Sequence, residues 1–277
     1  MDLFNSNRKL EPWPYANPPT ISAFQFERWN AHKWRRWMSK NWPLSIVATC
    51  IYLLLIFGGQ RFMKNRQAFN LKSTMIVWNF LLASFSTCGF IRTFPELYQV
   101  LSGPNGFHRS VCVRDTLHES SIFWAWLFTW SKLFELGDTA FIVLRKKPLT
   151  FLHWYHHITV FVFCWASYAH WEPILRWFGV VNMFVHSLMY TYYMLKGLNV
   201  PVPRSLSICL TSLQMSQMVC GIFVNAYAVY VKSKDEPCAR SEEGINLHLL
   251  MYGSYLILFA NYFYRAYILK KPRKKEL

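Results

Sequence analysis

Seven long apolar stretches dominate this chain of 277 residues. A bilayer core about 30 Å thick is crossed by roughly 20 residues of α-helix, which satisfies all of its own backbone polar groups. We therefore expect an all-α, polytopic membrane protein with seven transmembrane helices. Only 16% of the residues are charged, against about 25% in soluble domains, which supports this class. The stretches cover residues 43–63, 74–101, 121–144, 150–171, 174–195, 205–231 and 246–269.

The segments that flank these stretches suggest three regions. Residues 1–42 form an N-terminal segment, residues 43–269 form the membrane domain, and residues 270–277 form a basic tail. The first apolar run begins only near residue 43, which favours an uncleaved anchor over a cleaved signal peptide. Within the N-terminal segment, residues 26–42 predict an amphipathic helix on the membrane surface. Its aromatic side chains are expected to face lipid: Phe26, Trp29, Trp34 and Trp37.

The distribution of Lys and Arg predicts the orientation. With seven spans, connectors 61–73, 145–149 and 196–204 lie on the same side as the tail, and together with it they carry fourteen basic residues. The three opposite connectors carry five. Since basic loops stay in the cytosol, we expect a cytosolic C-terminus. The basic residues of the predicted surface helix disagree with this orientation, because they favour a cytosolic location for the N-terminal segment as well. This topology also explains the net charge of +16 without a nucleic-acid partner.

Two of the seven cysteines lie outside the apolar stretches. Cys112 and Cys238 both fall in connectors on the non-cytosolic side, where an oxidising lumen permits pairing. We expect one disulfide between them. The other five behave as small apolar residues within the spans.

Polar side chains recur inside four consecutive spans, where such groups are costly and usually functional. At 100° per residue, each helix gathers its polar groups on one face. Counted along the helix axes, most lie about 9–18 Å from the cytosolic ends, so they form one layer. The residues are Lys132, Glu135 and Asp138; His153, His156 and His157; Asn182, His186, Tyr190 and Tyr193; and Thr211, Gln214 and Gln217.

Three imidazoles on one helix face are consistent with two chemistries. A di-iron desaturase or hydroxylase would need several further histidine clusters, whereas a single zinc site stays open on ligand number. Acyl transfer would use imidazole as nucleophile and as general acid–base, next to a carboxylate. A seven-span receptor or transporter would leave the histidines unexplained. Lys132 and Glu135 could instead form a structural ion pair, and the sixth-span amides could be interhelical hydrogen bonds.

The four sets of polar residues resemble, in order, the signature motifs of the very-long-chain fatty acid elongases. The two residues between His153 and His156, Trp154 and Tyr155, resemble those of the subgroup that acts on saturated and monounsaturated acyl-CoAs. The resemblance implies condensation of a long-chain acyl-CoA with malonyl-CoA to 3-ketoacyl-CoA, CO₂ and CoA. It also implies that six helices, the second to the seventh, enclose an acyl tunnel. The motifs are Lys132-x-x-Glu135-x-x-Asp138-Thr139, His153-x-x-His156-His157, His186-x-x-Met189-Tyr190-x-Tyr192-Tyr193 and Thr211-x-x-Gln214-x-x-Gln217.

The resemblance also implies residue roles. His156 would take the acyl group as an acyl-imidazole, with His186 facing it. Asp138 would orient an imidazole, and Lys132 or Gln214 would stabilise the enolate. The other expected catalytic residues are His153, His157 and Glu135, and the expected substrate-binding residues are Asn182, Tyr190, Tyr193, Gln214, Gln217, Arg145, Lys146 and Lys147.

No cofactor or metal is expected beyond the two CoA substrates. The final residues, Lys274-Lys275-Glu276-Leu277, look like a dilysine retrieval signal, and the alternative reading as a lumenal retention signal also indicates the endoplasmic reticulum. The expected partners are the bilayer and the reductases and dehydratase of the elongation cycle. Acyl chain length, saturation and oligomeric state, with a homodimer among the alternatives, stay open.

Overall fold

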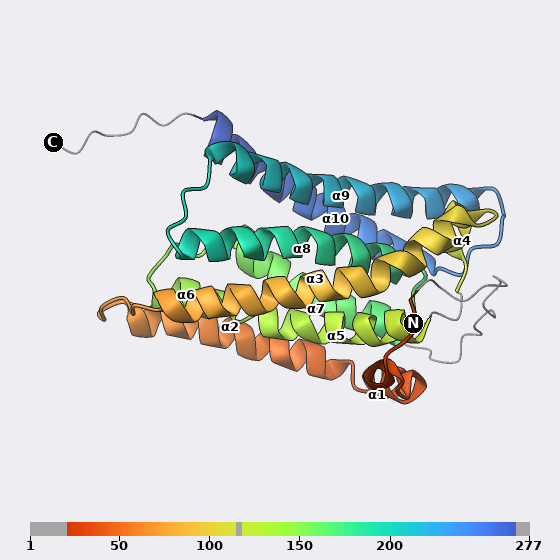
Figure 1. Ribbon diagram of the computed structural model, residues 1–277, viewed down its shortest axis with the longest axis horizontal. Coiled ribbons are helices and arrows are strands. Elements are labelled where there is room, and N and C mark those ends of the chain that lie inside the picture. The colour runs from red at the N-terminus through yellow and green to blue at the C-terminus, as the bar shows by residue number, and fades with distance from the viewer. Residues whose placement is uncertain (1–20, 115–117, 270–277) are drawn as a thin grey trace.

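The computed structural model describes residues 21–114 and 118–269, and within them it contains helices and no strand. The long helices run side by side along the long axis of the molecule (Figure 1). In chain order the helices are η2 (Gln25–Glu27), α1 (Ala31–Lys40), α2 (Pro43–Met63), α3 (Lys72–Ser102), α4 (Gly106–Cys112), α5 (Glu119–Glu135), α6 (Asp138–Leu144), α7 (Phe151–His170), α8 (Leu175–Gly197), α9 (Arg204–Ser233), α10 (Glu242–Phe263) and the π-helical η3 (Tyr264–Ile268).

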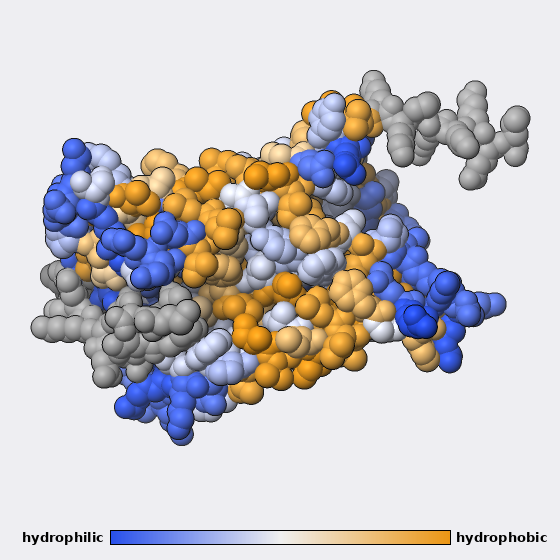
Figure 2. Space-filling view, turned by 180° about the vertical axis from the view of Figure 1, so that it is seen from behind, coloured by the Kyte–Doolittle hydropathy of each residue, from blue (hydrophilic) through white to orange (hydrophobic). Residues whose placement is uncertain are grey.

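Three of the described helices, α2, α3 and α9, are long and apolar enough to cross a membrane. Only 17%, 22% and 22% of their apolar windows are buried, so most of these side chains face outward. Apolar side chains occupy the middle of the molecule and hydrophilic ones gather at its two ends (Figure 2). This arrangement is that of a multi-pass membrane protein, because an outward apolar belt is stable only against lipid.

The third apolar stretch is not one helix, contrary to the expectation for residues 121–144. Helix α5 ends at Glu135 and α6 begins at Asp138. Across the break, Gly137 N–H donates to Phe134 O at 2.8 Å and Ala140 N–H donates to Gly137 O at 2.9 Å, so bonds spanning three residues interrupt the helical ladder. A Cβ at Gly137 would lie 3.0 Å from the carbonyl oxygen of Phe134 and from the indole of Trp78. Glycine therefore permits the close approach of α3 at this point.

The connectors alternate between the two ends of the bundle, as the seven stretches predict. Those after α2, α6 and α8 lie at the same end as η3, and α1, α4 and the α9–α10 connector lie at the other (Figure 1). At this second end, a disulfide joins Cys112 to Cys238, whose Cα atoms are 4.4 Å apart. Beside it, Ala239 N–H donates to Cys112 O at 2.7 Å.

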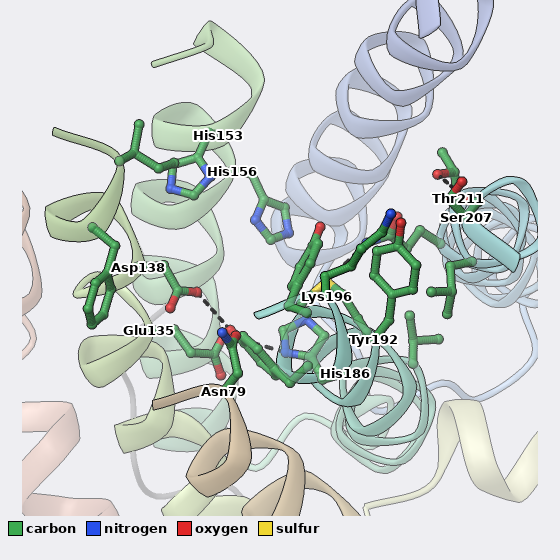
Figure 3. Close-up of a pocket in the computed structure, with 18 of the residues that line it drawn as sticks. Asn79, Glu135, Asp138, His153, His156, His186, Tyr192, Lys196, Ser207 and Thr211 are labelled. Atoms are coloured by element: carbon green, nitrogen blue, oxygen red, sulfur yellow. Dashed lines mark hydrogen bonds and ion pairs between the residues drawn. The ribbon is translucent and has the colours of Figure 1, made fainter. Parts of the chain in front are cut away.

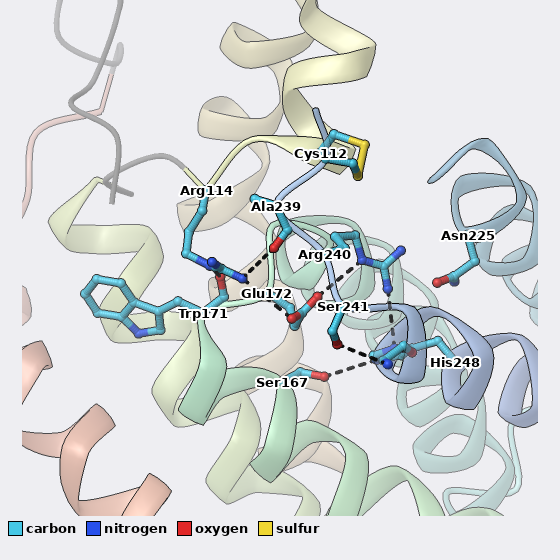
Figure 4. Close-up of polar contacts among 12 residues, drawn as sticks. Cys112, Arg114, Ser167, Trp171, Glu172, Asn225, Ala239, Arg240, Ser241 and His248 are labelled. Carbon is cyan, nitrogen blue, oxygen red and sulfur yellow. Dashed lines mark hydrogen bonds and ion pairs between the residues drawn. A yellow bond between two sulfur atoms is a disulfide. The ribbon is translucent and has the colours of Figure 1, made fainter. Parts of the chain in front are cut away.

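A buried polar network closes this second end (Figure 4). Glu172 accepts from Arg240 Nε at 3.2 Å and lies 3.7 Å from Arg114 Nη2. His248 lies 3.4 Å from Arg240 Nη2 and 3.2 Å from the hydroxyl of Ser167. Arg240, Glu172 and His248 are at most 6% exposed, and pairing of this kind is what allows charges to be buried.

Helix α1 packs on the outside of the bundle near the same end. Met38 is fully buried, and its carbonyl accepts from the indole of Trp165 at 2.9 Å. The ring centroids of Trp34 and Trp126 are 5.2 Å apart, and those of Trp37 and Trp165 are 6.0 Å apart. Side chains assigned to lipid from the sequence therefore also contact α5 and α7. Trp37 nevertheless stays 38% exposed.

Glu27 fixes the segment before α1. Its carboxylate is fully buried and accepts from Arg92 Nε at 2.8 Å and from Trp124 Nε1 at 2.7 Å. Burial alone would raise the pKa of Glu27, but the hydrogen bonds from Arg92, from the Phe24 backbone and from Trp124 outweigh it. The pKa is therefore lower than the ordinary value. Arg92, on α3, is thereby paired with a carboxylate from the N-terminal segment.

Candidate active site

One large cavity, of about 750 Å³, lies among α3 and α5 to α10 and reaches the connectors that hold Lys147, Thr150 and Asn199. All four predicted sets of polar residues contribute to it, from helices far apart in the sequence (Figure 3). The predicted residues that line it are Glu135, Asp138, Arg145, Lys147, His153, His156, His157, Asn182, His186, Tyr190, Tyr193, Gln214 and Gln217.

Helix α7 supplies three imidazoles to one wall of the cavity. Its first turn is capped by Thr150, whose hydroxyl accepts from His153 N–H at 3.3 Å. The ring centroids of His153 and His157 are 4.4 Å apart, and those of His156 and His157 are 5.6 Å apart. His157 is 8% exposed, and within the described residues its Nδ1 has no hydrogen-bond partner.

The fourth imidazole, His186, comes from α8 and lies next to a carboxylate. Its Nδ1 is 3.6 Å from Glu135 Oε2. In Figure 3, His156 and His186 occupy different helices around the same space. Within the described residues the Nδ1 of His186 has no hydrogen-bond partner, so the carboxylate faces the ring without a direct hydrogen bond.

Lys132 lies behind the cavity wall rather than in it. Its Nζ donates to Glu135 Oε1 at 2.8 Å, to Glu135 Oε2 at 3.0 Å and to Asn182 Oδ1 at 2.8 Å. The side chain is 2% exposed, and it does not line the cavity. These partners occupy its three N–H groups. This geometry matches the structural ion pair of Lys132 with Glu135, which was the alternative considered from the sequence. It does not support the expected contact of Lys132 with an enolate.

Asp138 is also held differently from the expectation. Its Oδ1 accepts from Trp78 Nε1 at 2.5 Å and its Oδ2 accepts from Tyr190 OH at 2.9 Å. No hydrogen bond joins it to an imidazole among the described residues. The hydroxyl of Thr139, one residue later, lies 2.9 Å from His153 Nε2. The neighbouring threonine thus makes the contact expected of the aspartate.

Basic side chains gather where the cavity meets the connectors. Lys72, Arg145, Lys147 and Lys196 line it there. Lys146 does not, because its Nζ donates to the carbonyl oxygens of Lys64 and Arg66, both at 3.0 Å. Of the Arg145–Lys147 run, only Arg145 and Lys147 thus line the cavity, and the contact of Lys146 with substrate stays a prediction without support from the cavity lining.

The sixth-span residues divide between the two readings given from the sequence. Thr211 donates to Ser207 O at 3.0 Å and contacts Tyr267 OH at 3.1 Å, as expected of interhelical packing. Gln214 Nε2 lies 3.2 Å from the sulfur of Met189, which is a weak acceptor. This amide therefore keeps donor capacity toward the cavity.

Several lining residues were not predicted. Asn79, a polar residue inside an apolar stretch, carried a detectable signal. Trp78, Phe259 and Tyr262 carried none, because aromatic residues are common throughout these helices. Within the described residues, no group of three or more His, Cys, Asp or Glu side chains is arranged to hold a metal ion.

A narrow space continues beyond the histidines, away from the connectors. It shares His156, Asn182 and Gln217 with the large cavity and ends at Ser167 and His248, which belong to the polar network of Figure 4. The side chains along it are mostly apolar: Phe128, Val160, Phe163, Cys164, Leu175, Phe178, Met218, Met251, Tyr252 and Tyr255.

Comparison with known proteins gives consistent matches over most of the chain. The model of the GNS1/SUR4 family matches residues 37–275. The chain is 49% identical over 258 residues to very long chain fatty acid elongase 6 of Drosophila melanogaster, covering 91% of this chain and 81% of the fly protein. It is 41% identical to human very long chain fatty acid elongase 3 over 87% of this chain and 89% of that protein. For human very long chain fatty acid elongase 6 the identity is 38%, over 93% and 98%.

Proposed function

The chain belongs to the GNS1/SUR4 family, and from this membership we propose that it condenses a long-chain acyl-CoA with malonyl-CoA. The products are 3-ketoacyl-CoA, CO₂ and CoA, which makes the chain a fatty acid elongase acting at the first step of the cycle. One observation carries the assignment: His153, His156, His157 and His186 meet in a single cavity of about 750 Å³ that continues into an apolar space.

The first half-reaction loads the acyl group. A ring nitrogen of His156 attacks the thioester carbonyl and the C–S bond breaks. The N–H proton of the His156 ring passes through a neighbouring imidazole to the departing sulfur, and CoA leaves as the thiol. The result is an acyl-imidazole on His156. His156 suits this role because it lies where the large cavity meets the apolar space, so that an acyl tail can extend past it.

The second half-reaction forms the carbon–carbon bond. Malonyl-CoA loses CO₂, and the electron pair of the broken bond forms an enolate at the α-carbon. This carbon attacks the acyl carbonyl and the C–N bond to His156 breaks. The ring of His156 leaves as neutral imidazole after receiving a proton, which is supplied from solvent through a neighbouring imidazole. The amide of Gln214, whose contact in the structure is a thioether, donates to the enolate oxygen.

Glu135 prepares His186 for proton transfer in both half-reactions. Its Oε2 lies 3.6 Å from His186 Nδ1 and stabilises the charged ring. Lys132 keeps that carboxylate in place, and Asn182 accepts from Lys132 and holds the ammonium there, so Lys132 need not touch the substrate. Asp138 acts in the same indirect way, holding Tyr190 at the cavity wall.

The membrane arrangement follows from the same proposal. The helices α5 with α6, α7, α8 and α10 also cross the bilayer, to give seven spans, and the six after α2 enclose the acyl tunnel. The break at Gly137 leaves α5 and α6 with only 17 and 7 residues, and polar side chains lower the hydropathy of α7, α8 and α10. Length and composition therefore identify only α2, α3 and α9. The basic cavity mouth and the C-terminus face the cytosol, where Lys72, Arg145, Lys147 and Lys196 meet CoA phosphates.

The remaining assignments concern location and assembly. The disulfide is lumenal, and the protein resides in the endoplasmic reticulum. The retrieval signal lies in residues 270–277, outside the described residues. The enzyme needs no cofactor beyond its CoA substrates, and its products pass to the reductases and dehydratase of the cycle. Its regions are the 1–42 segment, the 43–269 membrane domain and the tail.

The closed end of the apolar space, at Ser167 and His248, should set the length of the acyl chain that the enzyme prefers. From His156 to Ser167, α7 advances eleven residues, or about 16 Å. An extended hydrocarbon advances about 1.3 Å per carbon, from a C–C bond of about 1.5 Å, so this length matches roughly a dozen carbons beyond the carbonyl. The space has a volume of only about 30 Å³, so its side chains must move apart to admit the acyl tail. We expect Phe178→Ala to lengthen the preferred substrate by two or more carbons and Cys164→Phe to shorten it, because both side chains line this space. Turnover of acyl-CoAs of 12 to 20 carbons measures the shift.

Phe223→Ala serves as the control for this experiment. Phe223 is 61% exposed on α9, so its removal should leave the chain-length profile unchanged. An unchanged profile in both Phe178→Ala and Cys164→Phe would place the acyl tail elsewhere.

A direct assay tests the condensation itself. The purified protein, treated with chelator, is given palmitoyl-CoA and radiolabelled malonyl-CoA, and both CO₂ and 3-ketoacyl-CoA are followed. We expect equal amounts of the two, dependent on malonyl-CoA and unaffected by the chelator. Absence of product with acyl-CoAs of every length tested would contradict the proposal, and loss of turnover on metal removal would contradict its metal-free chemistry.

A further inference from the structure

Helix α2 places the hydroxyl of Tyr52 inside the bundle. The buried residues of α2 form a single stripe that consists of Ser45, Tyr52, Ile56 and Met63. Ser45 donates to Trp42 O at the start of this helix, whereas the hydroxyl of Tyr52 reaches another helix. The Tyr52 hydroxyl lies 2.7 Å from Thr139 Oγ1. Within residues 21–114 and 118–269 it has no other hydrogen bond, and Tyr52 belongs to a hydrophobic cluster with Leu136, Val143 and Ile158. A hydroxyl in such surroundings requires a partner.

Thr139 departs from most threonines of the helices. In an α-helix, a threonine hydroxyl usually donates to the carbonyl three or four residues earlier. Seven threonines of this chain donate to the carbonyl four residues before them: Thr49, Thr87, Thr93, Thr129, Thr159, Thr191 and Thr211. Thr139 makes no such bond among the described residues, because it lies directly after the break between α5 and α6. Its hydroxyl contacts Tyr52 OH and His153 Nε2 instead.

The chain of contacts fixes the direction of its hydrogen bonds. Thr139 has one O–H proton and can donate to only one of its two neighbours. Accepting from both would leave that proton without an acceptor among the described residues, so Thr139 accepts from one and donates to the other. If it donated to Tyr52, the phenol proton would be left without an acceptor among apolar neighbours. Tyr52 therefore donates to Thr139, and Thr139 donates to His153 Nε2. An imidazole nitrogen that accepts carries no proton, so the proton of neutral His153 resides on Nδ1.

We propose that Tyr52 and Thr139 are positioning residues that hold His153 as its Nδ1–H tautomer, so that Nε2 is unavailable as a base and the ring acts as a hydrogen-bond donor. This inference rests on the proposed function, in which the substrates occupy the cavity lined by His153. It divides the histidines of the site by role. His156 is the nucleophile, His153 donates a hydrogen bond, and His157 or His186 removes the proton. It also gives α2, which contributes no residue to the cavity wall, a part in the reaction.

The test compares substitutions that remove or retain the hydroxyl. Thr139→Val keeps the shape of the side chain and removes its O–H. We expect kcat to fall about 10–100-fold, less than the roughly 100–10,000-fold contribution of a general acid–base group itself, because Thr139 acts through His153. KM should stay within about twofold because the ground-state binding surface is unchanged. Thr139→Ser, which retains the hydroxyl, should stay within about threefold of wild type. Tyr52→Phe should lower kcat less than Thr139→Val, and the double variant should be no worse than Thr139→Val alone, since both act through one contact.

Thr49→Val is the matched control. It removes a threonine hydroxyl from α2 that donates only to its own helix, at Ser45 O, and should leave kcat unchanged. A value of kcat within twofold of wild type in Thr139→Val, or an equal loss in Thr139→Ser, would overturn the inference. An equal loss in Thr49→Val would do so as well, because the effect would then be one of packing.

A second measurement does not depend on turnover. In protein labelled with ¹⁵N-histidine, the His153 resonances are identified by their absence in His153→Gln. The Nδ1 signal should be protonated in wild type, and Thr139→Val should shift the population toward Nε2–H. A protonated Nε2 in wild type would overturn the proposed tautomer. If wild type forms no 3-ketoacyl-CoA with any acyl-CoA, the proposed function fails, while the resonances still report whether the hydrogen-bond chain exists.

Discussion

Replacing His156 with alanine is expected to lower the rate of condensation by about 10⁴-fold or more, the scale on which removal of a nucleophile acts in enzymes with covalent intermediates. The same substitution should abolish the acyl-enzyme. With wild type and palmitoyl-CoA but no malonyl-CoA, intact-mass spectrometry should show a gain of one palmitoyl group, and His156→Ala should show none. The physical reason is that no other group takes the place of the lost imidazole at the junction of the large cavity with the apolar space.

Two comparisons make this result specific. His32→Ala removes an exposed imidazole on α1, outside the cavity, and should change neither the rate nor the mass gain. His186→Ala should slow formation of the acyl-enzyme without preventing it, because His186 moves protons and does not carry the acyl group. A palmitoyl adduct that persists in His156→Ala would assign the nucleophile to another residue.

Replacing Lys132 with methionine should give the largest loss of stability of any single substitution in the site. Lys132 and Glu135 are 2% and 3% exposed, and Lys132 is the cation that balances the carboxylate. Removal of one partner of a buried pair destabilises a protein by about 3–5 kcal/mol, because the other charge stays buried without compensation. Thermal unfolding in detergent should show a large fall in Tm, together with loss of activity.

The double substitution Lys132→Met and Glu135→Met separates stability from function. It removes both charges, so most of the lost stability should return. Activity should not return, because His186 then lacks the carboxylate 3.6 Å from its Nδ1. The exposed pair Arg28 and Glu119, whose side chains are 63% and 60% exposed, offers a control: Arg28→Met should change Tm little. A double variant as active as wild type would reduce Glu135 to a counter-ion for Lys132.

Helical periodicity was sufficient to place most of the site. The residues of each motif are three or four positions apart, so they fall on one face, and the depth of that face follows from the helix rise. His153, His156, His157, Asn182 and His186 accordingly meet in the cavity. The alternation of the connectors between the two ends followed from the number of apolar stretches, because consecutive spans run in opposite directions.

Hydrogen-bond partners across helices could not be predicted in this way. The sequence paired Asp138 with an imidazole because carboxylates often orient histidines, but Trp78 and Tyr190 occupy both of its oxygens. Trp78 lies in an apolar stretch with no periodic signal of its own. The break at Gly137 was missed because a glycine within a helical pattern does not by itself indicate an interruption. That break depends on the close approach of the Trp78 indole, which is a property of the packed bundle.

The position of the disulfide along the chain has a consequence for how the protein is made. Cys112 and Cys238 are separated by 126 residues, and Cys238 follows α9, so only α10, η3 and the tail remain to be synthesised when the second thiol emerges. Almost all of the cavity-forming helices must therefore already be inserted before the bond can close. Its presence in a newly made chain distinguishes molecules whose membrane insertion is nearly complete from those arrested earlier, and an oxidising enzyme that acts at this step would act on a nearly assembled bundle.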